Sequence, residues 1–241
     1  MNFYTASDTG RVRTQNEDFC YASDGKLGIL SNLFVVCDGM GGHNAGEYAS
    51  EGAVRLMTDA ILRAEEAYDP YDALSIGIEA ANRTIHQRSV DDPTKAGMGT
   101  TLVAATIFNS DLYVANVGDS RLYIFASGNL RQITRDHSYV EEMVRKGLIN
   151  REEARHHRDR NKITRAVGVL NDVRIDFFDT PIEEGMQILL CTDGLTGMMH
   201  DEEIAGVLQT SADVRQKAET LIRMANEKGG TDNVTVILIE V

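Results

Sequence analysis

Tryptophan is absent from this chain of 241 residues, and proline and cysteine each occur only three times. Cys20, Cys37 and Cys191 are odd in number and lie in apolar segments, which favours buried reduced thiols over disulfides or zinc ligands. No segment approaches the ~18 consecutive apolar residues of a membrane span. The N-terminal residues MNFYTASDTG lack the apolar core of a signal peptide. We therefore expect a soluble cytoplasmic protein without membrane insertion.

Positive charge is also scarce. Lys and Arg number 24 against 37 Asp and Glu, which gives a net charge of -13. A surface of this sign repels nucleic acids and anionic membranes, so neither is an expected partner. The surplus of carboxylates suits a protein that holds divalent cations. Because the chain has no internal repeat, low-complexity tract or linker, we expect a single domain over residues 1–241.

Short apolar runs separated by tight turns predict strands. They are expected within residues 1–32 and at 33–37, 102–108, 112–117, 121–125, 130–133, 173–178, 187–191 and 234–241. Apolar residues spaced by three and four predict helices at 44–64, 74–85, 201–208 and 212–227. Strands joined by such short turns are antiparallel neighbours, because a parallel pair needs a crossover of about a dozen residues.

The segment 136–168 interrupts this pattern with dense charge and two short predicted helices, 139–146 and 151–156. Asn150 can cap the second helix, with Glu153 at the capping-box position. Polar helices within a strand-rich region suit a flap beside a functional site. The adjacent His156 and His157 would point to different sides of a helix, so a solvated surface is favoured over a metal site.

Aspartates stand at the ends of several predicted strands. Asp38 and Asp193 each follow an apolar run and precede a glycine, Asp119 follows a strand by one glycine, and Asp232 precedes the last strand. A single Asp-Gly pair is equally well explained as a tight turn. Its recurrence at several strand ends favours a shared site, where antiparallel strands bring these carboxylates to one edge.

Glu17 and Asp18, at the start of another strand, can join this cluster. Buried carboxylates at one rim repel each other unless cations neutralise them, and oxygen ligands suit Mg²⁺ or Mn²⁺. Two such ions ~4 Å apart stabilise the attacking and leaving oxygens of a phosphoryl displacement. Arg13 could then bind the phosphate oxygens. The alternative for the polar stretch 11–18 is a solvated edge.

Seven motifs follow one another along the chain: GRVRTQNED, FVVCDGMGGH, GMGTTLVAA, VANVGDSRLY, ITRDHS, LLCTDGLT and GGTDNVTVILIEV. With them the chain resembles, from about Asp8 to Val241, the metal-dependent Ser/Thr protein phosphatases of the PP2C (PPM) type in their compact bacterial form. The resemblance implies an α+β fold, a four-layer αββα sandwich of two antiparallel sheets flanked by helices, with a helical flap near the active site. It also implies two Mn²⁺ or Mg²⁺ ions at one end of the sandwich.

The resemblance also implies ligand roles. Asp38 would bridge the two ions, and the carbonyl of Gly39 would complete the coordination of one of them. Asp193 and Asp232 would hold the other ion. Glu17 and Asp18 would act through coordinated water.

Further roles follow from the same resemblance. Arg13 would bind the phosphate, and Asp119 would hold a weaker third ion, near Asn161. The nucleophile would be the water or hydroxide that bridges the metals, without a covalent phosphoenzyme. Eukaryotic members have a histidine where this chain has Met40. His43 would either donate a proton to the leaving group or shape the loop, and in the second case metal-bound water would be the acid.

The function implied is hydrolysis of phosphoserine and phosphothreonine on proteins, by a monomer that opposes a membrane-anchored bacterial Ser/Thr kinase. One alternative is a catalytically silent adaptor of the same fold that binds phosphoproteins. The full set of Arg13, Asp38, Asp193 and Asp232 weighs against it. A second alternative is a two-metal nuclease or phosphodiesterase, which the acidic composition disfavours.

Overall fold

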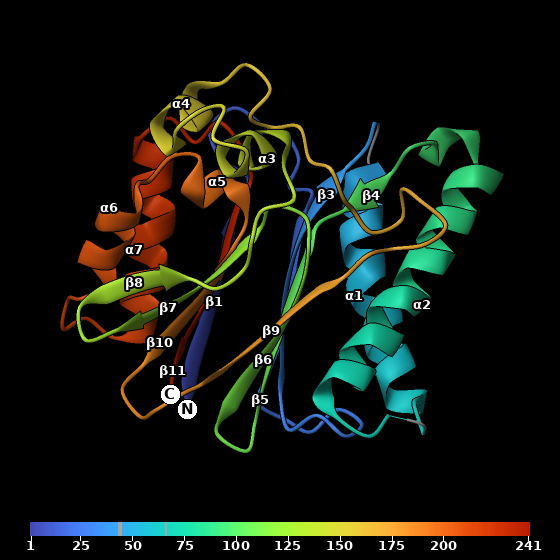
Figure 1. Cartoon of the computed structure of the whole chain (residues 1–241), viewed down its shortest axis with the longest axis horizontal. Coiled ribbons are helices and arrows are strands. Elements are labelled where there is room, and N and C mark those ends of the chain that lie inside the picture. The colour runs from blue at the N-terminus through green and yellow to red at the C-terminus, as the bar shows by residue number, and fades with distance from the viewer. Residues whose placement is uncertain (43–44, 66) are drawn as a thin grey trace.

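Two antiparallel sheets lie face to face in the computed structural model, which describes residues 1–42, 45–65 and 67–241 (Figure 1). Across these ranges the first sheet runs, in spatial order, through β1 (Asn2–Asp8), β11 (Val234–Glu240), β10 (Gln187–Cys191), β7 (Arg121–Ala126) and β8 (Asn129–Gln132). The second runs through β2 (Asp18–Ser23), β3 (Leu33–Met40), β5 (Leu102–Phe108), β6 (Asp111–Val117) and β9 (Asp176–Pro181), with β4 (Gly99–Thr100) beside β3.

Helices cover the outer face of each sheet. On the second sheet lie α1 (Ala45–Arg63) and α2 (Pro70–Asp91), followed by the short η1 (Pro93–Lys95), and on the first lie α6 (Asp201–Leu208) and α7 (Val214–Glu227) (Figure 1). This arrangement confirms the predicted α+β sandwich of four layers. None of the helices that the structure describes is both long enough and apolar enough to cross a bilayer.

Three apolar layers hold the four layers of secondary structure together. In β3, Phe34 and Val36 pack between the two sheets, whereas Val35 and Cys37 pack under α1 and α2. Successive residues of a strand point to opposite faces, so a strand covered on both sides has no polar position. This double burial explains the uninterrupted apolar run before Asp38 and gives that carboxylate a rigid support.

Most predicted elements are present, with two corrections. The strand predicted at 173–178 is β9, which begins three residues later, because Val173 and Ile175 pack against the core from a loop rather than from the sheet. The turn expected after β10 is instead the short helix α5 (Asp193–Thr196). Four residues are too few to show a helical period.

The flap segment contains α3 (Tyr139–Arg145) and α4 (Arg151–His156), and the predicted capping box of Asn150 with Glu153 is confirmed. Its two ends are joined at the base, where the backbone N–H of Tyr139 donates to Lys162 at 2.8 Å. Both helices lie at the end of the sandwich, beside α5 (Figure 1). His156 is exposed and contacts Glu152, as expected for a solvated surface.

Candidate metal centre

Two of the predicted ligands lie opposite each other in the second sheet. Asp18 begins β2 and pairs in register with Asp38 near the end of β3. Side chains of directly opposed residues share one face of a sheet, so the two carboxylates point the same way. Asp18 is buried and Asp38 half-buried. The backbone of Gly39 is packed so tightly that an added Cβ would lie 2.1 Å from the carbonyl oxygen of Gly46.

The first sheet brings two more carboxylates to the same end. Asp193 follows β10 as the first residue of α5, and Asp232 precedes β11. A Cβ on Gly194 would lie only 1.9 Å from the carbonyl oxygen of Asn233, so only glycine allows α5 to sit on this turn. The close approach places Asp193 beside Asp232.

Asn233 fastens the N-terminal loop to the start of β11. Its Oδ1 accepts from the backbone N–H of Glu17 at 2.8 Å, and its Nδ2 donates to the carbonyl oxygens of Thr9 and Gln15. Arg13, in the same loop, donates from Nη2 to Oδ2 of Asp232 at 2.9 Å, and half of its side chain is exposed. The two sheets and this loop therefore meet at one end of the sandwich.

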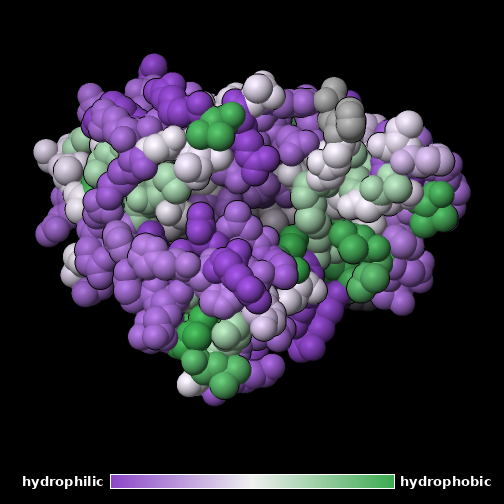
Figure 2. Space-filling view, turned by 90° about the horizontal axis from the view of Figure 1, so that it is seen from above, coloured by the Kyte–Doolittle hydropathy of each residue, from purple (hydrophilic) through white to green (hydrophobic). Residues whose placement is uncertain are grey.

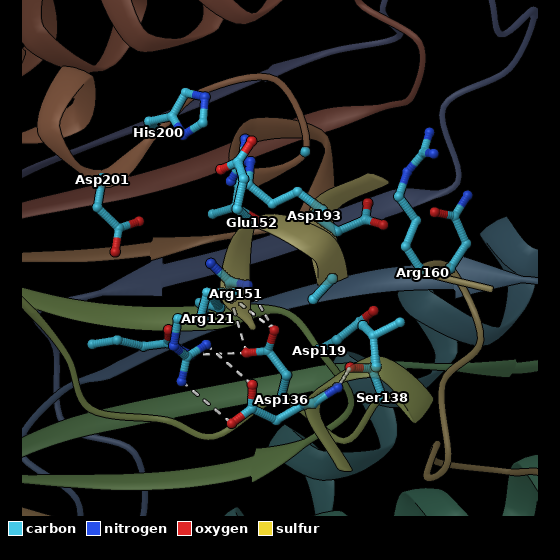
Figure 3. A pocket seen from close by; sticks show the side chains of 18 of the residues that line it. Asp119, Arg121, Asp136, Ser138, Arg151, Glu152, Arg160, Asp193, His200 and Asp201 are labelled. Carbon is cyan, nitrogen blue, oxygen red and sulfur yellow. Dashed lines mark hydrogen bonds and ion pairs between the residues drawn. The ribbon is translucent and has the colours of Figure 1, made fainter. Parts of the chain in front are cut away.

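A cavity of about 450 Å³ opens under the flap at this end, and both Asp119 and Asp193 line it (Figure 3). Asp119 follows β6 by one residue, Gly118, whose φ of +114° is readily adopted only by glycine. One wall contains Arg121, which donates to both oxygens of Asp136 (Figure 3). Asn161 also lines the cavity. Asp119 thus belongs to the acidic cluster and also lines a cavity large enough to hold part of a substrate.

The acidic side chains raise one another's pKa. Burial, followed by the charges of Asp193 and Asp232, raises the pKa of Asp18 to about 7. Burial and the charge of Asp232 raise that of Asp193 to about 6. The pKa values of Asp38 and Asp119 lie well above the ordinary carboxyl value, first because of burial and then because of Asp193. Such a cluster is unfavourable as a set of bare anions and favours bound cations.

Individual oxygen atoms fit a hard cation. Oδ1 of Asp18 and Oδ1 of Asp193 are buried and have no hydrogen-bond partner among the described residues. The second oxygen of Asp18 is occupied, because the hydroxyl of Thr192 donates to it at 2.9 Å. No three acidic, histidine or cysteine side chains of residues 1–42, 45–65 and 67–241 already form a closed ligand set. The unpartnered oxygens of Asp18 and Asp193 are therefore the atoms that best fit a bound cation.

Comparison with known proteins decides the family. The profile of the family described as protein phosphatase 2C matches residues 4–145. The serine/threonine phosphatase stp of Listeria welshimeri is 41% identical over 245 residues, which cover 97% of this chain and 93% of that protein. This chain belongs to the protein phosphatase 2C family.

Solved structures of protein phosphatase 2C relatives share the sandwich. The Mycobacterium tuberculosis serine/threonine phosphatase PstP/Ppp matches with a TM-score of 0.90 and 35% identity over 100% of this chain and 98% of that chain. The catalytic domain of PstP in complex with two manganese ions matches with a TM-score of 0.87 and 34% identity over 99% and 97%. That catalytic domain, which this chain matches over nearly its full length, was solved in complex with two manganese ions.

The predicted site of this protein phosphatase 2C member lies at one end of the fold. The residues that the structure brings there are Arg13, Glu17, Asp18, Asp38, Gly39, Asp119, Asp193 and Asp232. His43 lies outside the described residues, so its predicted role stays a prediction. Met40 is half-buried, with its methyl group close to Gly99.

Sequence reasoning missed the hydroxyl groups that orient the carboxylates. Thr192 accepts from the backbone N–H of Thr235 at 3.0 Å while donating to Asp18, so it connects β10, β11 and β2. Thr101 accepts from the backbone N–H of Asp38 at 2.9 Å. Each lies in a family motif next to, or opposite, a predicted ligand. That position is the only signal the sequence offers.

Proposed function

We propose that this chain hydrolyses phosphoserine and phosphothreonine on proteins with the help of two or three bound Mn²⁺ or Mg²⁺ ions. The observation that carries the proposal is the convergence of buried carboxylates from both sheets with Arg13 beside them. Two of these carboxylates, Asp18 and Asp193, have a buried oxygen without a partner in the described structure. Relatives named serine/threonine phosphatase stp and protein phosphatase PhpP, 41% and 34% identical, support the substrate class.

The proposed ligands come from both sheets. Asp38, with the carbonyl of Gly39, and Asp193 and Asp232 would hold the two main ions, and Glu17 and Asp18 would act through water. Asp119, on the cavity side, would hold a weaker third ion. When bound, such ions lower the pKa of water and neutralise the charge that develops in phosphoryl transfer.

The chain's own groups bind and orient the phosphate. Arg13 is half exposed, and its guanidinium can donate two parallel hydrogen bonds to a phosphate. Nη2 of this guanidinium donates to Asp232, and arginine has further N–H donors with which to bind a phosphate. The thioether of Met40 cannot donate a proton to the leaving alkoxide. A proton from the chain itself would have to come from another group, and His43 remains the proposed candidate.

A phosphoprotein is the substrate that we propose, in line with the relatives named as serine/threonine and protein phosphatases. Seen from above, the molecule is mostly hydrophilic, with small separate apolar patches (Figure 2). The net charge of -13 disfavours nucleic acid. We place the activity in the cytoplasm, which the free thiols of Cys20, Cys37 and Cys191 support. A bacterial Ser/Thr kinase as the opposing enzyme and a monomeric state complete the proposal.

Phosphate release from a phosphothreonine peptide tests this function. We expect turnover with Mn²⁺ and none with chelator. Asp38→Asn should lower kcat by at least ~10³-fold, because it would remove a negative charge that helps to hold the ions. Asp59→Asn, on the exposed face of α1, should leave kcat unchanged.

Three results would contradict the proposal. Turnover in chelator would exclude the metal mechanism. Tight binding of the phosphopeptide without turnover would favour the silent adaptor, which the intact set of carboxylates disfavours. Hydrolysis of nucleic acid only would favour the nuclease.

A further inference from the structure

Asp38 is held by its backbone from the strand opposite. Val36 pairs with Val103 and Gly39 with Thr100, and the same register puts Asp38 opposite Thr101. The carbonyl oxygen of Asp38 accepts from the backbone N–H of Thr101 and from the hydroxyl of Thr100, each at 2.9 Å. The N–H of Asp38 donates to the side-chain Oγ1 of Thr101, also at 2.9 Å.

This bond replaces part of the regular strand pairing. In an antiparallel hydrogen-bonded pair, the two residues normally exchange two bonds between backbone groups. Here the N–H of Asp38 donates to the hydroxyl oxygen of Thr101, in place of the backbone carbonyl oxygen of Thr101. The strand interruption lies at this point, between β4 and β5.

The same hydroxyl reaches the loop that carries Asp119. Oγ1 of Thr101 lies 2.7 Å from Oγ of Ser120, and both residues are buried. Ser120 directly follows Asp119. A Cβ on Gly118, on the other side of Asp119, would lie 2.6 Å from the side chain of Thr101. Thr101 is therefore enclosed between the Asp38 backbone and the 118–120 turn, and its hydroxyl bonds to both.

We propose that Thr101 is a positioning residue whose hydroxyl fixes Asp38 relative to Asp119, so that the two carboxylates take up their cations as one preorganised set. The inference rests on the proposed function, because it assumes that both carboxylates bind metal. Hydrogen-bond partners behind metal ligands commonly change metal affinity by 10- to 100-fold when they are removed. We expect the hydroxyl, and not the shape of the side chain, to control metal affinity. Valine has the same shape as threonine but cannot make these hydrogen bonds, so Thr101→Val isolates the contribution of the hydroxyl.

Thr106 provides a matched control within the same strand. It is fully buried in β5, and its hydroxyl donates to a backbone carbonyl, that of Asn32, at 2.7 Å. Thr106→Val therefore removes a buried hydroxyl at a position remote from the site. If losing any buried hydroxyl weakens Mn²⁺ binding, both variants should show it. If the hydroxyl of Thr101 positions the ligands, only Thr101→Val should bind Mn²⁺ more weakly.

The test is calorimetric titration of the full chain with MnCl₂ and no substrate, supported by thermal melts in chelator. We expect Thr101→Val to raise the Mn²⁺ dissociation constant by ~10-fold or more. Thr101→Ser, which keeps the hydroxyl, should stay within about threefold of wild type, and Thr106→Val should match wild type. Asp119→Asn should abolish the binding of one ion, and Ser120→Ala should weaken the binding of that same ion by ~10-fold.

The outcomes separate this inference from the proposed function. If wild type binds no Mn²⁺ and releases no phosphate, the proposed function fails. If wild type binds Mn²⁺ but Thr101→Val binds it as tightly as Thr106→Val, only the positioning role is overturned. Should Thr101→Val not fold, Ser120→Ala decides, and unchanged Mn²⁺ binding in that variant overturns the proposal.

Discussion

Replacing Asp18 with asparagine should stabilise the metal-free protein while weakening its response to metal. Asp18 is 8% exposed, and its Oδ1 has no partner among the described residues. Burial is the main reason why its pKa rises from the ordinary 3.8 to about 7. Burial in the folded protein therefore favours the protonated carboxyl group of Asp18. The stability linked to this group is complete below pH 3.8 and is lost as the pH rises through 7.

The size of the effect follows from the pKa. A rise from 3.8 to about 7 corresponds to ~4 kcal/mol of stability lost when the carboxyl ionises in the folded state. Asparagine has no charge to bury, but its NH₂ group lacks a partner, which costs about 1–3 kcal/mol. The net gain at pH 8 is ~1–3 kcal/mol. For a chain of this length, about 1 kcal/mol raises Tm by roughly 2–4 °C.

Thermal melts in chelator measure this difference. We expect Asp18→Asn to melt about 5 °C above wild type at pH 8, and the gap to close toward pH 5, where wild-type Asp18 is protonated. Saturating Mn²⁺ should close this gap, because binding at 100 times Kd adds about 2.7 kcal/mol to wild type, which is about the size of the variant's advantage. Asp24→Asn, at an exposed position after β2, should show neither effect. A variant that melts below wild type in chelator at pH 8 would refute the reasoning.

Two further substitutions test the site's construction. Arg13→Lys keeps the charge but loses the two-pronged donor, so kcat/KM for a phosphopeptide should fall by roughly 10- to 100-fold; an unchanged kcat/KM would remove Arg13 from the phosphate site. Gly194→Ala must push α5 away from the carbonyl of Asn233, so unfolding free energy should fall by ~1–3 kcal/mol and Mn²⁺ should bind more weakly. Gly206→Ala, with open space at its Cβ, is the matched control and should not weaken Mn²⁺ binding. Equal Mn²⁺ affinity in both glycine variants would contradict the proposed role of the close contact.

Local patterns were enough to predict most of the fold. The β-branched and apolar runs of β3, β10 and β11 have no competing periodicity, so their type was unambiguous. The cap at Asn150 depends only on neighbours in sequence, and it is present. The pattern predicts the start of β9 too early, because an apolar residue such as Val173 gives the same signal whether it packs from a strand or from a loop.

The site was only partly predictable because its geometry depends on contacts between distant segments. The aspartates could be recognised from their positions at strand ends. The bonds of Thr192 to Asp18 and Thr101 to Asp38 could not, because each joins strands whose pairing the sequence does not specify. The contact between Arg13 and Asp232 was also missed, since it connects residues near opposite ends of the chain.

The position of β11 has a consequence for how the protein is made. This strand lies inside the first sheet, between β1 and β10, and the turn before it contains Asp232. A ribosome makes β1 before the other described strands and β11 after them, so β1 has no neighbour in its sheet until β11 has been made. A nascent chain can complete neither this sheet nor the acidic cluster until residues 232–240 have emerged. Activity therefore begins only when translation of this region is finished.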